Sequence, residues 1–235
     1  MVPDSYTSKN DSYSIYNIYF DTENYDIIRH SLSKPYYKEK LRLRSYAIPS
    51  SPDDKVFLEL KKKIGGIVSK RRATLTLNEA NRFISKREYP LETNVINHLV
   101  LEEIDNFLEH HIIEPKAYIS YKRSAYFGKN DLEFRVTFDH NITSHQNNLS
   151  LTKGDFGSPL LPKDDYIMEI KILGAIPLWL AHALSSLKIY SSSFSKYGNT
   201  YKEYRRQSMA KIINMPIPGN TKLNYCISNQ RRIEC

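Results

Sequence analysis

The stretch KEKLRLRSY at residues 38–46 alternates cations with leucines. Lys40, Arg42 and Arg44 occupy every second position, and a leucine lies between each pair. Successive side chains of a β-strand point to opposite faces, so the three cations share one face and the leucines share the other. A chain with this segment must place one face of the strand in an apolar core and the other in water or beside an anion.

The positive charge of the chain is concentrated around this segment. The 235 residues carry 34 Lys and Arg against 26 Asp and Glu, a formal net charge of +8. Residues 34–72 contain twelve of these cations and only four of the carboxylates, while the rest of the chain is balanced. The excess is therefore local, which points to a binding surface for an anion. Composition alone favours the alternative interpretation, a generally basic surface.

Further segments show the same alternation, which is typical of strands. The predicted strands are 16–21, 40–45, 56–63, 68–75, 117–127, 132–139 and 166–173. Gly65 and Gly66 predict a tight hairpin between the third and fourth of them. Helical spacing is found at 24–32, 78–85, 93–110 and 177–187. The pattern predicts an α+β fold dominated by an antiparallel β-barrel with flanking helices.

Neither an internal repeat nor a linker divides the chain, so we expect a single domain over residues 1–210. The pattern fades after Tyr204, and a poorly structured tail is expected over residues 211–235. Both cysteines, Cys226 and Cys235, fall in that tail, so no disulfide framework is expected. The sequence shows no secretory leader and no membrane-spanning apolar run, which predicts a cytoplasmic protein.

Charged residues alternate with apolar ones on the other predicted strands as well. The positions concerned include Glu59, Lys61, Lys70, Arg72, Glu133, Arg135, Asp139, Glu169 and Lys171. One interpretation is an amphipathic sheet with its charges in water. The other is a barrel with a polar lumen, its apolar exterior covered by helices, among them the leucine-rich segment 177–187. A cationic lumen would require an anion, because unpartnered buried charges cost several kcal/mol each. Phosphate oxygens suit arginine and lysine, and carboxylates among the cations suit a divalent metal that bridges phosphates.

Several other classes of site are disfavoured. The sequence contains neither of the two common glycine-rich nucleotide-binding loops and no zinc-ligand spacing. Its cations alternate with leucines inside strands, without a helix-turn-helix or RNA-recognition signature, so nucleic-acid binding is not expected.

Eight motifs in a fixed order resemble a known family. They are YFDT (19–22), KEKLRLRSY (38–46), FLELKKK (57–63), SKRR (69–72), SYKRSAY (120–126), FRVTFD (134–139), IMEIK (167–171) and SSFSKYG (192–198). Together they resemble the VTC-type polyphosphate polymerase domain, in its bacterial stand-alone form, over about residues 13–204. That domain belongs to the triphosphate tunnel metalloenzymes, relatives of the CYTH phosphatases and adenylyl cyclases. The resemblance implies an eight-stranded tunnel that transfers the γ-phosphate of ATP to a growing polyphosphate chain, with Mn²⁺ or Mg²⁺ as the metal.

The resemblance also implies roles for individual residues. Catalytic cations would be Arg42, Arg44, Lys61, Lys70, Arg123 and Arg135. Ser195 and Lys196 match the closing phosphate-binding pair, and Glu169 matches the metal-holding glutamate. Alternation places Lys40, Glu59, Arg72, Asp139 and Lys171 on the same face, so Lys40, Arg72 and Lys171 are expected to bind substrate and Glu59 to bind metal.

The chain departs from the family at one point. The family opens with a strand of alternating Glu and Lys, whereas this sequence starts at MVPDSYTSK and offers no counterpart. We therefore expect a tunnel one strand short at its N-terminus. Two alternatives to the polymerase remain open from sequence, namely hydrolysis of tripolyphosphate or a nucleoside triphosphate in the same site, and polyphosphate binding without catalysis.

Overall fold

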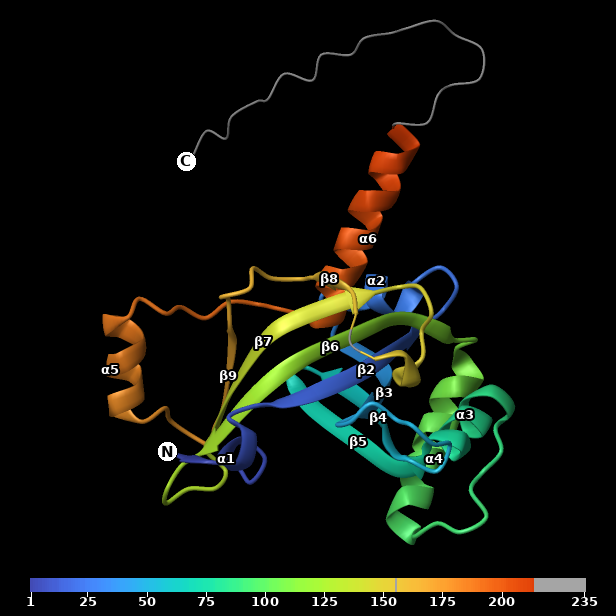
Figure 1. The fold of residues 1–235 in the computed structure, drawn as a ribbon, viewed down its shortest axis with the longest axis horizontal. Coiled ribbons are helices and arrows are strands. Elements are labelled where there is room, and N and C mark those ends of the chain that lie inside the picture. Colours follow the sequence, from blue (N-terminus) through green and yellow to red (C-terminus); the bar gives the residue numbers. More distant parts are fainter. Residues whose placement is uncertain (155, 214–235) are drawn as a thin grey trace, which may run out of the picture.

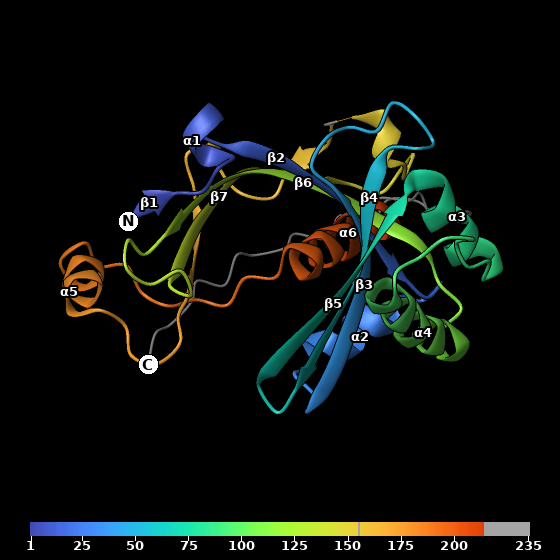
Figure 2. The same cartoon turned by 90° about the horizontal axis from the view of Figure 1, so that it is seen from below.

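The computed structural model describes residues 1–154 and 156–213, in which a strongly curved antiparallel sheet forms the body (Figures 1 and 2). Its strands are β1 (Val2–Pro3), β2 (Tyr13–Asp21), β3 (Tyr37–Ser45), β4 (Lys55–Ile64), β5 (Ile67–Thr76), β6 (Glu114–Phe127), β7 (Arg135–His145), β8 (Ser158–Pro159) and β9 (Ile167–Lys171). The helices are α1 (Thr7–Asn10), α2 (Asp26–Leu32), α3 (Leu77–Lys86), α4 (Val95–His110), the 3₁₀ helix η1 (Leu151–Lys153), α5 (Leu178–Ser186) and α6 (Lys196–Ile213).

The strands follow the order β5-β4-β3-β2-β6-β7-β8, with β1 paired to β6 and β9 paired to β7. Within the described residues no backbone pairing joins β5 to β9, so the sheet is an open arch. The sequence predicts a barrel one strand short at its N-terminus, and the structure has the antiparallel sheet of such a barrel without closure. The seven predicted strands are all present. The two-residue strands β1 and β8 were not predicted, because they are too short to show a period.

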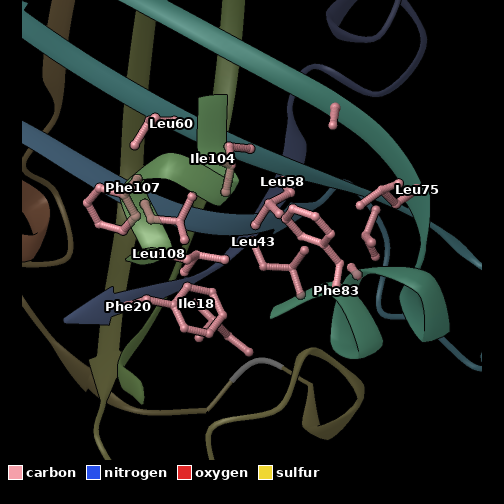
Figure 3. Close-up of a cluster of buried hydrophobic side chains, with 14 of the residues drawn as sticks. Ile18, Phe20, Leu43, Leu58, Leu60, Leu75, Phe83, Ile104, Phe107 and Leu108 are labelled. Carbon is pink, nitrogen blue, oxygen red and sulfur yellow. The ribbon is translucent and has the colours of Figure 1, made fainter. Parts of the chain in front are cut away.

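The outer, convex face of β3, β4 and β5 is covered by α3 and α4. Leu43 and Leu58 pack there against Phe83 of α3 and against Ile104 and Phe107 of α4 (Figure 3). α3 begins with a capping box, in which the Thr76 hydroxyl accepts from the backbone N–H of Glu79 and the Glu79 carboxylate accepts from the backbone N–H of Thr76. The leucines of the alternating strands thus face the core, and their cations must face the inside of the arch.

The inner, concave face is partly filled by α2 and by the start of α6 (Figure 2). Tyr197 of α6 is buried, and its ring stacks on Tyr19 of β2 with the centroids 4.9 Å apart. Its hydroxyl donates to Asp21 at 2.8 Å, and the same carboxylate accepts the backbone N–H groups of Ile27 and Ile28 in α2. Asp21 therefore joins β2, α2 and α6.

Two predictions about the helices need correction. α6 (Lys196–Ile213) was not predicted. The predicted tail begins at residue 211, and its residues 214–235 lie outside the described part of the chain. The segment 177–187 does form α5, but it covers only the β7–β9 end of the sheet, through Leu180 and Leu184. The cover over β3–β5 comes from α3 and α4 instead. No described helix is long and apolar enough to cross a lipid bilayer.

Candidate functional site

The registers of β3, β4 and β5 bring their inward-facing cations into rows. Arg42 lies opposite Glu59, and Glu59 lies opposite Arg72. In the next row Lys40 lies opposite Lys61, which lies opposite Lys70. Like charges directly opposite each other destabilise a sheet, so the lysine row has no structural benefit of its own.

Glu59 is the centre of the first row. Only 1% of its side chain is exposed, and both carboxylate oxygens accept from cations. Arg42 Nε lies 2.7 Å from Oε2, and Lys70 Nζ and Arg72 NH2 lie 2.8 and 2.5 Å from Oε1. Burial alone would raise the pKa of Glu59, but Arg42, Arg44 and Lys70 hold that pKa well below its usual range. Glu59 is therefore ionised and orders the surrounding cations.

The positive charges of the row Lys40–Lys61–Lys70 are less well neutralised by carboxylates than those of the row Arg42–Glu59–Arg72. Burial lowers the pKa values of Lys40, Lys61 and Lys70. Lys70 reaches Glu59, whereas the Lys40 ammonium has the Ser195 hydroxyl as a hydrogen-bond partner, at 3.3 Å. We define the β3–β5 wall as Lys40, Arg42, Arg44, Lys61, Lys70, Arg72 and Glu59. Six cations and one carboxylate make it a surface suited to a polyvalent anion.

Neutral side chains hold the arginines of this wall in place. Arg44 is buried and donates to the Asn17 side-chain oxygen at 2.9 Å and to the Tyr121 hydroxyl at 3.1 Å. Arg42 NH1 donates to the Tyr19 hydroxyl at 3.0 Å. These partners stabilise the guanidinium groups without cancelling their charge.

Tyr19 lies at the junction of the wall and α6. Burial would raise its pKa, but Arg42, Arg44 and Lys196 outweigh burial and lower the pKa to about 8. The phenol beside these cations therefore gains its negative charge closer to neutral pH than an ordinary tyrosine does.

The opposite side of the arch carries cations that are each matched by a carboxylate. Arg123 binds both oxygens of Asp139, at 2.6 and 2.8 Å. Lys196 Nζ lies 2.6 Å from Asp139 Oδ2. Looser pairs join Arg135 to Asp4 and Lys171 to Glu169, at 3.6 Å each. We define the β6–β9 wall as Arg123, Arg135, Lys171, Lys196, Asp4, Asp139 and Glu169. Four cations and three carboxylates leave it nearly neutral.

All the predicted site residues therefore lie on the concave face or at its rim, in two groups. The predicted residues Arg42, Arg44, Lys61, Lys70, Lys40 and Arg72 form the β3–β5 wall, and Ser195 adjoins it through Lys40. The predicted residues Arg123, Arg135, Lys171 and Lys196 form the β6–β9 wall with Glu169. Burial lowers the pKa of Lys61, and the negative charge of Glu169 opposes part of this shift, so Glu169 acts electrostatically on Lys61 of the other wall.

The two predicted metal ligands differ in their surroundings. Both oxygens of Glu59 already accept from arginine and lysine, so this carboxylate does not fit a metal cation. Glu169 is half-exposed and paired only with Lys171. In the described part of the chain no group of three or more His, Cys, Asp or Glu gathers in a metal-binding arrangement. The donor set does not fit a metal held by the protein alone.

Sequence reasoning missed several residues of the site. Asn17, Tyr19 and Tyr121 hold the arginines, and Asp4 pairs with Arg135. A signal for two of them was present, because Asn17, Tyr19 and Asp21 alternate along one strand and therefore share a face. Asp4 lies beside a two-residue strand, where periodicity gives no information.

The sequence matches the VTC domain over residues 1–204. Among solved structures, one that the fold resembles is a crystal structure from Bacillus halodurans described as a "putative adenylate cyclase", with 16% sequence identity and a TM-score of 0.47 over 80% of this chain and 81% of that one. None of the curated proteins matches the sequence.

Proposed function

Since the chain belongs to the VTC domain family, we propose that it is a polyphosphate polymerase that transfers the γ-phosphate of ATP to a growing inorganic polyphosphate chain. The observation that carries this proposal is the β3–β5 wall, where six cations surround one ionised carboxylate. A triphosphate or polyphosphate supplies the missing negative charge along the direction of the rows.

In this proposal the wall positions the reactants and offsets charge. Lys40, Lys61 and Lys70 hold phosphate oxygens, and Arg42 and Arg72 are fixed by Glu59 so that their free N–H groups point to the substrate. A terminal oxygen of the acceptor chain attacks the γ-phosphorus, the new P–O bond forms as the bond to the β–γ bridging oxygen breaks, and ADP leaves. The negative charge that develops on the bridging oxygen is stabilised by the cations, so no protein nucleophile is needed.

A divalent ion, Mn²⁺ or Mg²⁺, is expected with the triphosphate in this family. When bound it would neutralise phosphate oxygens, with Glu169 as the carboxylate available to it on the β6–β9 wall. The role of Glu59 in this proposal is to order cations, in place of the metal-binding role expected from sequence.

A second candidate function is polyphosphate binding without catalysis. It is favoured by the open edge between β5 and β9, because an arch holds water near the phosphates and encloses them less than a closed tunnel does.

The test is incubation of the purified protein with ATP and Mn²⁺, followed by gel analysis of the products. The polymerase predicts a ladder of polyphosphate that Arg42→Ala abolishes. Release of orthophosphate without a ladder would instead identify a triphosphate hydrolase. Tight polyphosphate binding without either product would identify the binding protein.

A further inference from the structure

The segment around α5 exposes an unusual number of apolar side chains. Figures 1 and 2 show α5 at the end of the molecule farthest from α3 and α4. Exposed fractions are 77% for Leu178, 55% for Trp179 and 69% for Leu187. The flanking residues Leu173, Ile176, Ile189 and Tyr190 are exposed as well. We call these seven residues the α5 patch.

The helix cannot bury this patch within the fold. α5 has the sequence LWLAHALSS, which is apolar on nearly every side, and a helix of this kind is normally buried on most of its surface. Leu180 and Leu184 pack on Phe134, Val136 and the strand β9, and these contacts use one side of the helix. The remaining sides are left to water, and an apolar patch of this kind marks an interaction site.

Charge restricts what can cover the patch. Residues 170–202 contain no Asp or Glu, but they contain Lys171, Lys188, Lys196 and Lys202. Lys188 flanks Leu187 and Ile189 of the patch in sequence, whereas Lys171 is already paired with Glu169. Trp179 and Tyr190 are the side-chain types that prefer the boundary between water and the acyl chains of a bilayer.

We propose that the α5 patch docks the protein on a lipid surface rich in anionic headgroups. The apolar side chains enter the acyl boundary, and Lys188 faces the headgroup phosphates. The proposal goes beyond the polymerase function and does not depend on it, because none of the seven patch residues belongs to either wall.

Two other possible partners of the α5 patch, a second copy of the chain and another protein, fit the charges around the patch less well. A symmetric dimer would place the patch against its own copy, and the flanking lysines of the two copies would meet without a carboxylate between residues 170 and 202 to pair with. A protein partner would need an acidic rim around an apolar centre. An anionic membrane supplies both features at once.

A matched control exists on the opposite end of the molecule. α4 exposes Val95, Ile96 and Leu99, which are comparably apolar. Glu92, Glu102 and Glu103 accompany them in sequence. An anionic membrane should therefore reject the α4 surface and accept the α5 patch.

Trp179 is the only tryptophan of the chain, so its fluorescence reports on the patch directly. The experiment adds phosphatidylcholine vesicles with or without phosphatidylglycerol to the full chain and records the emission maximum, together with co-sedimentation. We expect a blue shift with the anionic vesicles, binding roughly tenfold tighter than to pure phosphatidylcholine, and weaker binding at high salt. Leu178→Asp with Leu187→Asp should abolish the shift, and Ile96→Asp on α4 should not.

Several outcomes would overturn the proposal. One is an unchanged emission maximum with anionic vesicles, and another is equal binding to both vesicle types. Binding that survives the α5 double variant would assign the contact to another surface. A blue shift that grows with protein concentration in the absence of lipid would assign the patch to self-association. The double variant should keep the circular dichroism spectrum and the thermal unfolding midpoint of the wild type, which shows that it folds.

Discussion

The two walls of the arch face the same interior and use the same residue types, yet they differ in how far carboxylates neutralise their cations. On the β6–β9 wall, Arg123 and Lys196 share Asp139 in short, mostly buried contacts. On the β3–β5 wall, one carboxylate at Glu59 orders four cations, and Lys40 and Lys61 have no carboxylate in direct contact among the described residues. The paired cations of the β6–β9 wall stabilise the fold, whereas the cations of the β3–β5 wall remain available to an anion. On this basis we propose that phosphate binds mainly on the β3–β5 wall.

Removing the charge of Glu59 should have the largest effect on stability. Loss of one partner from a buried ion pair costs about 3–5 kcal/mol, and the partial exposure of Lys70 and Arg72 reduces this to about 2–3 kcal/mol for Glu59→Gln. The free energy of unfolding in urea measures the effect. Glu169→Gln, at a half-exposed pair, is the matched control and should cost less than about 1 kcal/mol. Equal losses in the two variants would remove the distinction between the walls.

The pH dependence of stability follows from the same carboxylate. The fold lowers the pKa of Glu59, so its ionised form stabilises the protein above the unfolded pKa of 4.5, and this contribution is lost as the pH falls further. The wild-type protein should therefore lose stability below about pH 4.5 more steeply than Glu59→Gln. Parallel curves for the two proteins would contradict this assignment.

Asp139→Asn should show that the β6–β9 wall has a structural task. It leaves Arg123 and Lys196 without their shared carboxylate, at a cost of about 2 kcal/mol. Hydrogen exchange at the start of α6 should become faster, while the affinity for tripolyphosphate should not fall. Glu203→Gln, farther along α6, removes only an exposed contact with Arg206 and should leave exchange at the start of the helix unchanged. A large loss of tripolyphosphate affinity in Asp139→Asn would show that this wall binds substrate directly.

The smallest of the expected effects is a pH-dependent change in phosphate affinity caused by Tyr19. Its pKa of about 8 means that the phenol gains negative charge beside Arg42 as the pH rises through that value. Phosphate binding should weaken there by about 1 kcal/mol, roughly fivefold. Tyr19→Phe should remove this step and keep the decline that comes from Lys40, Lys61 and Lys70 as they lose their protons. Calorimetric titration with tripolyphosphate between neutral and alkaline pH measures both, and identical profiles would exclude Tyr19 as the titrating group.

The strands could be predicted from sequence, and so could the face of each strand that carries the cations. Arg42 and Arg44 alternate with leucines, so when helices cover the leucine face the arginines must lie on the other face. The sequence could not distinguish cations available to bind substrate from cations that form ion pairs within the fold. Lys62 and Arg71 belong to the same basic stretch, but both face outward and pair with Glu103 of α4, at 2.8 and 3.0 Å. That pairing depends on where α4 packs, which no local pattern contains.

Closure of the sheet and the helix α6 were the main features that sequence reasoning missed. Pairing between strand edges depends on curvature accumulated over the whole sheet. In α6, Gly198, the last residue of the motif SSFSKYG, and Asn199 after it weaken the helical signal at the start of the helix. The contacts of Tyr197 with Tyr19 and Asp21 stabilise this turn, and they come from a strand more than a hundred residues earlier.

The most direct test of the unequal walls compares two charge-matched double variants. Lys40→Gln with Lys61→Gln removes two cations from the β3–β5 wall that do not touch Glu59, and Arg135→Gln with Lys171→Gln removes two from the β6–β9 wall. Calorimetric titration with tripolyphosphate should show a loss of at least about thirtyfold in affinity for the first pair and less than about fivefold for the second. Thermal unfolding should show that the Lys40→Gln, Lys61→Gln variant is at least as stable as the wild type, because the repulsion between neighbouring lysines is relieved. Equal losses of affinity, or a larger loss for the Arg135 and Lys171 variant, would contradict the assignment of phosphate binding to the β3–β5 wall.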